Sequence, residues 1–244
     1  WLLKKLEDTI QEFYDNGLLG RSIQGIDGFD FDVRVQMGAG SYVCGEETAL
    51  LESMEGKRGE PRTKWYFPTQ RGYLQQPTII NNVETFSNVS AILAHGSEWY
   101  AAIGTERSKG TKTFSLAGKI AHTGLIEVPM GTSLKEIVYG MGGGAPGGRE
   151  IKGVQTGGPS GGCIPASLFD LSVDYESLTA AGSIMGSGGL VVMDRYTCMV
   201  DVARYFLSFT QAESCGKCVP CRLGTHQMLR ILEEICEGRG TPEH

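Results

Sequence analysis

Three cysteines stand three residues apart near the end of the sequence, in "ESCGKCVPCRLGTH". Thiolates are soft ligands, and three of them in one short loop, Cys215, Cys218 and Cys221, suit the corners of a [4Fe–4S] cluster. Zinc sites more often use two separated pairs of ligands, and no second pair follows. The helix expected to begin near Leu223 would present its positive dipole end to an anionic cluster. The spacing therefore indicates an iron–sulfur site, with zinc and ordinary thiols as the alternatives.

A cube of iron and sulfur usually needs a fourth ligand, and the other cysteines do not supply an obvious one. Cys236 falls on an apolar helical face beside Ile235, and cysteine is among the most frequently buried residue types. We therefore expect Cys236, and by the same reasoning Cys198, to pack in a core. Cys44 and Cys163 lie in glycine-containing loops, and their spacing selects neither as a ligand.

A second candidate site lies in the glycine-rich stretch "GAGSYVCGEETAL". The stretch lacks a phosphate-binding lysine, and Glu46 and Glu47 stand where a helix should begin. Carboxylates at that end gain from the helix dipole but would repel a phosphate. They suit N–H or hydroxyl groups, such as those of a flavin edge or a ribose. Simple charge pairing at the helix start is an equally good explanation.

Residues 59–72, "GEPRTKWYFPTQRG", combine cations with flat rings. Cations can pair with anionic groups, and rings can stack on a flat ligand. The side chains concerned are Arg62, Lys64, Trp65, Tyr66 and Phe67. An aromatic loop of this kind more often serves packing than cofactor binding, so both explanations stay open.

Two short polar stretches complete the candidates. Asn81 and Asn82 precede an expected helix and offer amide donors and acceptors, with helix capping as the alternative role. Residues 157–162, "GGPSGG", are expected to form a tight loop without a ligand.

The pattern along the first hundred residues is that of an α/β domain. A strand, a glycine loop and a helix follow one another, which is the unit of many α/β ligand-binding domains. We expect helices at 2–14, 48–55 and 81–96, one strand at 31–37, and a long functional loop at 57–80.

From about residue 105 the pattern changes to short strands and then to helices. Ser133 and Glu136 stand in capping-box register at the start of one expected helix. We expect strands at 111–119, 124–130, 151–158 and 188–194, and helices at 132–144, 196–209 and 226–236. The predicted order is therefore an α/β part, a small α+β part and a helical tail.

Composition restricts the class of protein. The 244 residues are 41% hydrophobic and 20% charged, as in ordinary globular proteins, and the net charge is −6. Scattered cations and a negative net charge argue against nucleic acid and anionic membranes as partners. No apolar run approaches the roughly 20 residues of a membrane span, and no signal peptide is evident. Seven cysteines, an odd number, fit a reducing cytoplasm, and the start on Trp1 inside a helix suggests a fragment.

Four long motifs in this order resemble one known family. They are "GAGSYVCGEETALLESMEGKRGEPR", "PTIINNVET", "GSGGLVVMD" and "ESCGKCVPCRLG". The sequence resembles, essentially end to end, the flavin- and NADH-binding 51-kDa-type subunit of complex I. It is similar also to the related subunits of NAD(P)-linked hydrogenases and formate dehydrogenases.

The resemblance implies a fold in three parts. Residues 1–102 would be the C-terminal part of a Rossmann-like FMN- and NAD(P)H-binding domain. Residues 103–196 would form a ubiquitin-like β-grasp domain of the soluble ligand-binding type. Residues 197–244 would be a truncated helical bundle that carries the iron–sulfur loop.

The resemblance also implies the residues of each site. The FMN site would be lined by Tyr42, Gly45, Glu46, Glu47, Asn81 and Asn82. Glu47, Lys64 and Phe67 would face the nicotinamide nucleotide. Cys215, Cys218 and Cys221 would ligate the [4Fe–4S] cluster, and the fourth ligand is expected beyond residue 244.

Two departures from the family pattern bear on function. The family's glycine-rich loop that contacts the flavin phosphate would lie before Trp1, and "KWYF" at 64–67 replaces the Lys-Pro-Pro-aromatic sequence usual in complex I. "GGPSGGCIP" is more similar to the hydrogenase branch than to the respiratory one.

The function implied is that of an electron-input subunit. Hydride would pass from NAD(P)H to FMN, and single electrons would pass to the cluster and on to partners, namely a thioredoxin-like [2Fe–2S] subunit and a larger iron–sulfur or hydrogenase subunit. Two alternatives remain: a non-redox β-grasp module with a zinc-stabilised tail, and an inactive fragment without FMN or cluster.

Overall fold

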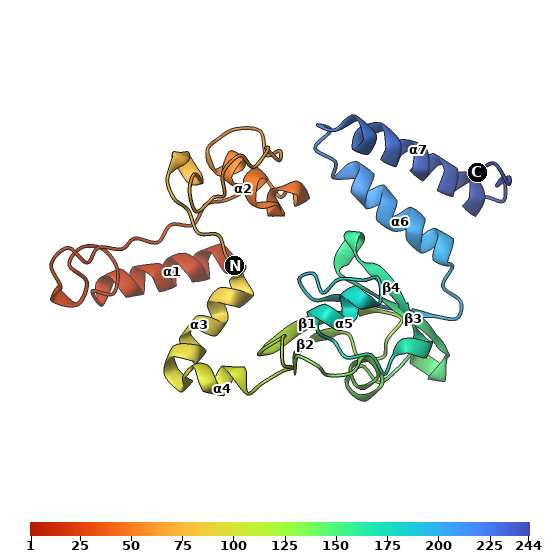
Figure 1. The fold of residues 1–244 in the computed structure, drawn as a ribbon, viewed down its shortest axis with the longest axis horizontal. Helices are drawn as coiled ribbons and strands as arrows, with labels where there is room; N and C mark the ends of the chain where they lie inside the picture. Colours follow the sequence, from red (N-terminus) through yellow and green to blue (C-terminus); the bar gives the residue numbers. More distant parts are fainter. The chain divides into compact units, whose positions relative to one another are not determined.

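The computed structural model describes residues 1–244 as a mixed α/β chain with one five-stranded sheet and several helices (Figure 1). The chain divides into two compact units, Trp1–Ile79 and Ile80–His244. Each unit has its own secondary structure, and each is described separately below.

The first unit contains two α-helices separated by a long irregular segment. Helix α1 spans Leu2–Asp15 and ends at Asn16, where Gly17 turns the chain with a φ of +66°. Helix α2 spans Glu47–Met54 and is followed by Gly56 with a φ of +75°. Both helices confirm the predictions, because in each case the apolar repeat stops at a glycine that can adopt the left-handed conformation.

The predicted strand at 31–37 is wrong. Only Phe31 makes a strand-like contact, an isolated antiparallel bridge to Gly20, and residues 32–37 have no ladder. The alternation of Val33 and Val35 satisfies the side-chain pattern of a strand, but a strand also needs a neighbour for its backbone hydrogen bonds. No segment of the 244 residues pairs with residues 32–37.

The predicted long loop at 57–80 is irregular, as expected, apart from one 3₁₀ turn at Tyr73–Gln75. Polar contacts tie it to α2. Arg62 donates from its backbone N–H to the Thr48 hydroxyl (3.0 Å) and from Nη1 to Glu52 (2.7 Å). Further along, the backbone N–H of Leu74 donates to Oε1 of Glu55 at 2.9 Å. These hydrogen bonds hold the loop against α2, the helix that follows the glycine-rich stretch.

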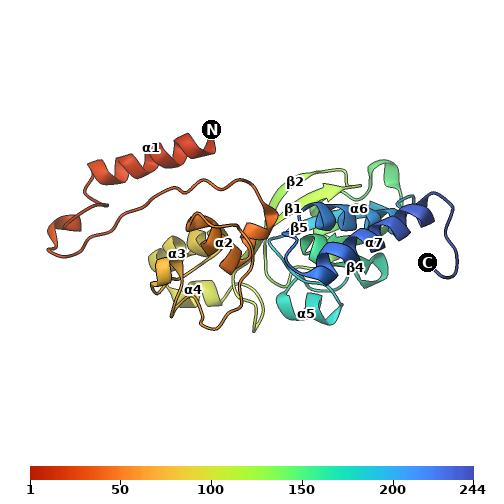
Figure 2. The ribbon, with the colours of Figure 1, turned by 90° about the horizontal axis from the view of Figure 1, so that it is seen from above.

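The second unit begins with helices and is built around the sheet (Figures 1 and 2). Its strand order is β2-β1-β5-β3-β4, with β1 and β5 parallel and every other pair antiparallel. The strands are β1 (Thr111–Gly118), β2 (Gly124–Pro129), β3 (Ile151–Thr156), β4 (Gly162–Pro165) and β5 (Gly189–Asp194). The helices are α3 (Val83–His95), α4 (Ser97–Ala101), α5 (Tyr175–Ala180), α6 (Met199–Ala212) and α7 (Val219–Cys236).

One hydrophobic core lies against this sheet. Phe114 and Leu116 alternate with less buried neighbours along β1 and point into the core. Val154 of β3 and Val192 of β5 join them, and Leu178 of α5 closes the core from the helical side. The four predicted strands are confirmed at these positions. The sheet order depends on β1 and β5 lying side by side, although more than seventy residues separate them in sequence.

Three short elements were not predicted, and one helix differs in form. Strand β4 and helices α4 and α5 have only four to six residues each, too few for a clear hydrophobic period. In the helix predicted at 132–144, Glu136–Met141 forms a π-helical turn. Ser133 caps it as expected, since its Oγ accepts the backbone N–H of Glu136 at 3.1 Å.

The turn before β5 requires glycine at position 188. Gly188 has a φ of +96°, and a Cβ there would lie 2.0 Å from the backbone oxygen of Thr113 in β1. We expect Gly188→Ala to lower the free energy of unfolding by more than about 2 kcal/mol, because left-handed strain adds to a clash with a central strand. Gly189→Ala is the matched control, since a Cβ at Gly189 meets nothing within 4 Å. Chemical denaturation measures both, and equal effects would contradict this account.

Candidate functional site

Glu46 caps the N-terminus of α2. Its Oε2 accepts hydrogen bonds from the backbone N–H groups of Thr48 (2.9 Å) and Ala49 (3.0 Å) and from the Thr48 hydroxyl. Partial burial disfavours the charged form, but these hydrogen bonds and the nearby Lys64 outweigh it, so the pKa of Glu46 is lowered. The carboxylate occupies the position at which a helix terminus could bind a phosphate, which supports the helix-start explanation for this residue.

Lys64 joins the two adjacent carboxylates. Its Nζ lies 2.5 Å from Oε1 of Glu47 and 3.5 Å from Oε1 of Glu46. The hydrogen bond to Glu47 is the largest cause of the raised pKa of Lys64. All three side chains are partly exposed, so the ion pairs contribute little to stability and act mainly to fix geometry. The structure thus brings together three of the predicted site residues, from the glycine-rich stretch and from the aromatic loop.

The other predicted residues of this unit lie in the open. Tyr42 and Gly45 begin and end the 3₁₀ turn Tyr42–Gly45, which leads directly into α2. The Tyr42 side chain is 55% exposed, and a Cβ on Gly45 would meet no atom within 4 Å. Phe67 is 68% exposed, so its ring is accessible to a ligand. Free space therefore borders the Glu46–Glu47–Lys64 group on the side of the turn.

The aromatic loop also encloses a hollow of about 500 Å³. Its lining contains two arginines and two aromatic rings but no carboxylate; the residues are Arg62, Thr63, Trp65, Tyr66, Arg71 and Gln75. We call it the arginine–aromatic hollow. The guanidinium carbon of Arg71 lies 4.2 Å from the centroid of the Tyr66 ring. Sequence reasoning singled out Arg62 and the rings but missed Arg71, which a turn at residues 67–70 brings back over the loop.

The predicted asparagines belong to the second unit. Asn82 is the N-cap of α3, and its Oδ1 accepts the backbone N–H of Glu84 at 2.8 Å, which confirms the capping role. Its amide nitrogen remains available as a donor, and both Asn81 and Asn82 are exposed. The six residues expected to line FMN are therefore divided between the two compact units.

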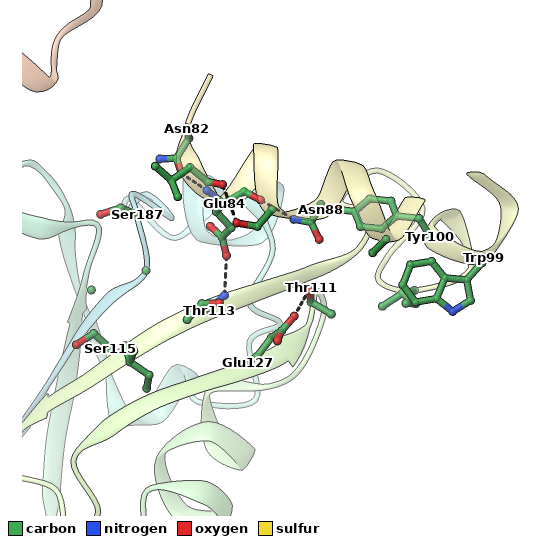
Figure 3. Close-up of a pocket in the computed structure, with 17 residues that line it drawn as sticks. Asn82, Glu84, Asn88, Trp99, Tyr100, Thr111, Thr113, Ser115, Glu127 and Ser187 are labelled. Carbon is green, nitrogen blue, oxygen red and sulfur yellow. Dashed lines mark hydrogen bonds between the residues drawn. The ribbon is translucent and has the colours of Figure 1, made fainter. Parts of the chain in front are cut away.

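Asn82 stands at one end of a hollow of about 830 Å³ lined by residues of α3, α4, the β1–β2 hairpin and the turn before β5 (Figure 3). Glu84 anchors this end. Its Oε1 accepts the backbone N–H of Thr113 at 2.9 Å, and its Oε2 pairs with Nζ of Lys112. Partial burial disfavours the charged form of Glu84, but Lys112 and Thr113 outweigh it and lower the pKa. The start of α3 is therefore fastened to β1.

Sequence reasoning did not identify the Lys112–Glu84 pair, although the sequence contains a signal for it. Lys112 shares the period-two position of Phe114 and Leu116 on the buried side of β1, and its side chain is only 4% exposed. Since a buried lysine needs a partner, a charged residue at a core position of a predicted strand indicates an ion pair.

The three cysteines of the predicted metal site lie at the start of α7. Helix α7 begins at Val219, before the start expected near Leu223 and before the predicted range 226–236, so that Cys218 is the N-cap and Cys221 lies in the first turn. The first turn carries no acidic residue. None of the three cysteines forms a disulfide, and Oγ of Ser214 lies 3.4 Å from Sγ of Cys221. No three cysteine, histidine or carboxylate side chains converge in metal-binding geometry, so the structure places the three candidate ligands at the start of α7 without gathering them.

The prediction that Cys198 and Cys236 are buried is wrong, since both are exposed. Helices α6 and α7 pack against each other as a hairpin (Figure 1), and neither contains a fully buried residue. An apolar helical face indicates burial only where another element covers it. Cys236 ends α7, so it lies about 22 Å along the helix axis from Cys221, too far to share a cluster with it.

Two protein-family models match the regions that contain the Glu46–Glu47–Lys64 group and the three cysteines. Residues 2–91 match the model described as the Nuo51 FMN-binding domain. Residues 201–244 match the NADH-ubiquinone oxidoreductase-F iron-sulfur binding region, which contains the three cysteines. The chain belongs to the 51-kDa family of complex I. The resemblance seen in the sequence motifs is thereby confirmed, and the FMN-binding and iron–sulfur regions of the 51-kDa family are both present.

Relatives of this 51-kDa-family chain come from both hydrogenases and complex I. It is 57% identical over 239 residues to the NADP-reducing hydrogenase subunit HndC of Solidesulfovibrio fructosivorans, covering 98% of this chain and 49% of that protein. It is 47% identical over 238 residues to an NADH-quinone oxidoreductase subunit of Rhizobium meliloti, covering 98% of this chain and 56% of that protein. The chain thus spans about half the length of the curated relatives it matches.

A solved structure also matches the fold of the 51-kDa-family chain. A crystal structure of an air-oxidised NAD⁺-reducing [NiFe]-hydrogenase aligns with a TM-score of 0.77 and 38% sequence identity, over 85% of this chain and 35% of that one. None of the helices described above is both long enough and apolar enough to cross a bilayer.

Proposed function

We propose that the chain is the electron-input part of a multi-subunit, hydrogenase-like NAD(P)H dehydrogenase. It would bind NAD(P)H and FMN, and it would deliver electrons through a [4Fe–4S] cluster to partner subunits. The observation that carries the proposal is the Glu46–Glu47–Lys64 group beside an open glycine turn, inside the region that matches an FMN-binding domain.

The residues around this group suit a flavin better than a bare phosphate. The helix terminus is already occupied by the Glu46 carboxylate, whereas Oε2 of Glu47 remains free to accept an N–H or hydroxyl group. The open space beside Gly45 leaves room for a ring. We propose that Tyr42, Gly45, Glu46 and Glu47 line the FMN together with Asn81 and Asn82, whose amides add hydrogen-bond donors.

The nucleotide would be held by the neighbouring loop. Lys64 supplies a cation whose position is fixed by Glu47, and Phe67 supplies an exposed ring. A lysine ammonium held between two carboxylates can donate to ribose hydroxyl groups, and a ring can stack on the flat bases of a dinucleotide. Glu47 thus stands between the two expected binding positions, which makes it the residue that orients one ligand against the other.

The thiols fit an iron–sulfur cluster in type and in sequence spacing. Cys215, Cys218 and Cys221 supply three soft ligands on one loop, and the first turn of α7 brings no competing negative charge. The positive end of the 18-residue helix favours an anionic cluster. We propose these cysteines as three ligands and expect the fourth from beyond residue 244.

When bound, FMN can accept a hydride and release single electrons, and a [4Fe–4S] cluster carries one electron at a time. The side chains of this chain bind and orient these groups. Lys64 and Glu47 hold opposite charges at a fixed distance. The three cysteines at the start of α7 would provide a separate exit point for electrons.

We propose the three-part domain organisation 1–102, 103–196 and 197–244. The strand order β2-β1-β5-β3-β4 with a parallel central pair supports a β-grasp domain, and the α6–α7 hairpin supports the beginning of a helical bundle. A Rossmann-like origin for the first part is supported by the family match over residues 2–91.

Partners are proposed from the relatives, whose names describe them as subunits. We propose a thioredoxin-like [2Fe–2S] subunit and a larger iron–sulfur or hydrogenase subunit in the cytoplasm. The 57% identity to a hydrogenase subunit supports the hydrogenase branch.

Glu47→Gln tests the proposal in the full-length holoprotein. Glutamine keeps the shape of the side chain but removes the charge that fixes Lys64, so we expect the KM for NAD(P)H to rise about tenfold, equivalent to roughly 1.4 kcal/mol. Iron content and the cluster spectrum should not change. Glu12→Gln on the exposed surface of α1 is the control. Failure of wild-type protein to bind FMN, or equal loss of flavin reduction and iron in the Glu47 variant, would refute the two-site arrangement.

A further inference from the structure

The arginine–aromatic hollow contains a cation that no carboxylate neutralises. Arg62 is paired with Glu52 through Nη1 at 2.7 Å. Arg71 forms no ion pair, and no acidic side chain lines the hollow. The only described contact of its guanidinium is with the face of Tyr66. The hollow therefore presents one uncompensated positive charge to a ligand.

The position of that charge is fixed by the backbone and by stacking. The N–H groups of Gln70 (2.8 Å) and Arg71 (3.0 Å) both donate to the carbonyl oxygen of Phe67, which closes a turn after the aromatic run. The contact of the guanidinium carbon with the face of Tyr66 is a cation–π contact that uses none of the N–H groups, so these stay available for hydrogen bonds. A guanidinium held in this way can bind a phosphate in bidentate geometry with little loss of side-chain entropy.

The remaining lining suits a flat base. Trp65 is 83% exposed, so one face of its indole is free to stack on a ring. The volume of about 500 Å³ lies within the usual range of small-molecule pockets. The hollow also adjoins Lys64 and Phe67 along the chain, the two residues proposed to face the nucleotide. An aromatic base and a phosphate are thus the two chemical groups that this surface recognises.

We propose that the arginine–aromatic hollow binds the adenosine end of the dinucleotide and that Arg71 pairs with a 2′-phosphate, so that the protein favours NADPH over NADH. This inference rests on the proposed function and specifies its substrate. A phosphate monoester carries a charge of about −1.5 to −2 at pH 7, and an arginine near the ribose is the usual means of accepting it. NADH has only a hydroxyl at that position and would leave Arg71 without a partner.

Calorimetric titration of the full-length holoprotein with adenosine 2′,5′-bisphosphate and with 5′-AMP tests the inference directly. The wild type should bind the bisphosphate more tightly. Arg71→Gln should raise the Kd of the bisphosphate about tenfold and that of 5′-AMP less than twofold. Arg71→Lys should give an intermediate loss, because it keeps the charge but not the planar fork. Arg21→Gln, at an exposed position of the same unit, should change neither.

Equal wild-type affinities for the two nucleotides, or equal losses for both in Arg71→Gln, would overturn the inference. Unchanged melting temperature and circular dichroism ensure that the variant is folded. Flavin reduction by NADH and NADPH in the wild type separates this result from the proposed function. Reduction by NADH without any preference for the bisphosphate overturns only the role of Arg71. Without flavin reduction by either nucleotide, the proposed function fails, while the titration still decides whether Arg71 reads a 2′-phosphate.

Discussion

Replacing Cys218 by serine should remove the iron–sulfur cluster from the full-length protein and leave FMN reduction by NAD(P)H intact. Serine offers a hard, protonated oxygen in place of a soft thiolate at the N-cap of α7. We expect iron content to fall by more than about tenfold, because the cluster would lose one of its ligands at the helix start. Iron analysis and the visible absorption of the cluster measure the loss, and anaerobic titration with NAD(P)H measures the flavin.

Cys236→Ser and Cys198→Ser are the matched controls, since both thiols are exposed and lie outside the cysteine loop. Both variants should keep full iron content. Iron loss in Cys236→Ser would place the fourth ligand inside this chain, against the distance set by α7. Stoichiometric zinc in the wild type would instead favour the zinc-stabilised module.

Local pattern was enough to predict the α2 region, because the residues concerned are close in sequence. Glu46 and Glu47 stand at a helix start that their own neighbours define, and Gly56 ends the same helix. The helix-capping role of Asn82 has the same local origin. The pairing of Lys64 with these carboxylates crosses about seventeen residues of helix and irregular loop, and spacing alone did not reveal it.

The sequence-based predictions were wrong where a segment needed a second element to pair with it or to cover it. The segment 31–37 alternates like a strand but has no neighbour to pair with. Cys236 lies on an apolar helical face, yet only one helix packs against α7. Periodicity records what a segment could bury, whereas burial depends on what the rest of the chain places against it.

Side-chain contacts set by the tertiary structure are the third class that sequence reasoning did not identify. Arg71 reaches Tyr66 only because of a turn closed on Phe67, and Lys112 meets Glu84 across 28 residues. Both involve ordinary surface-type residues whose significance depends on three-dimensional placement. The family motifs identified the residues expected to touch cofactors, but they did not indicate which contacts hold those residues in position.

Lys112→Met should destabilise the second unit by about 3 kcal/mol. Removing one partner of a buried ion pair leaves the other without compensation, which typically costs about 3–5 kcal/mol. We place the effect at the lower end because the Glu84 side chain is 32% exposed and partly screened, whereas Lys112 is 4% exposed. Chemical denaturation at pH 7 measures the loss. Lys119→Met, an exposed lysine just beyond β1, should change stability by less than about 0.5 kcal/mol.

The difference in the free energy of unfolding between wild type and Lys112→Met should become smaller as pH falls. The pKa of Glu84 is lowered in the folded protein, since Lys112 and Thr113 outweigh the opposing effect of burial. A lowered carboxylate pKa stabilises the fold fully above the unfolded value, about 4.3 for glutamate, and the stabilisation disappears as pH falls through the folded value. The two proteins should therefore converge in stability below about pH 4. A constant difference from about pH 7 to about pH 3 would contradict the ion-pair explanation.

The same pair should affect cofactor binding through α3. Glu84 follows Asn82 by two residues and fastens the start of the helix to β1, through Thr113 (Figure 3) and through Lys112. Loss of Lys112 frees that helix start, so Asn81 and Asn82 should hold FMN less well, and the Kd for FMN should rise several-fold in Lys112→Met. Adding Glu84→Gln to Lys112→Met should recover part of the stability, because it removes the uncompensated charge, but should not recover FMN affinity, because the link to β1 remains weakened. Recovery of both together would mean that the pair acts only on stability and does not position the asparagines.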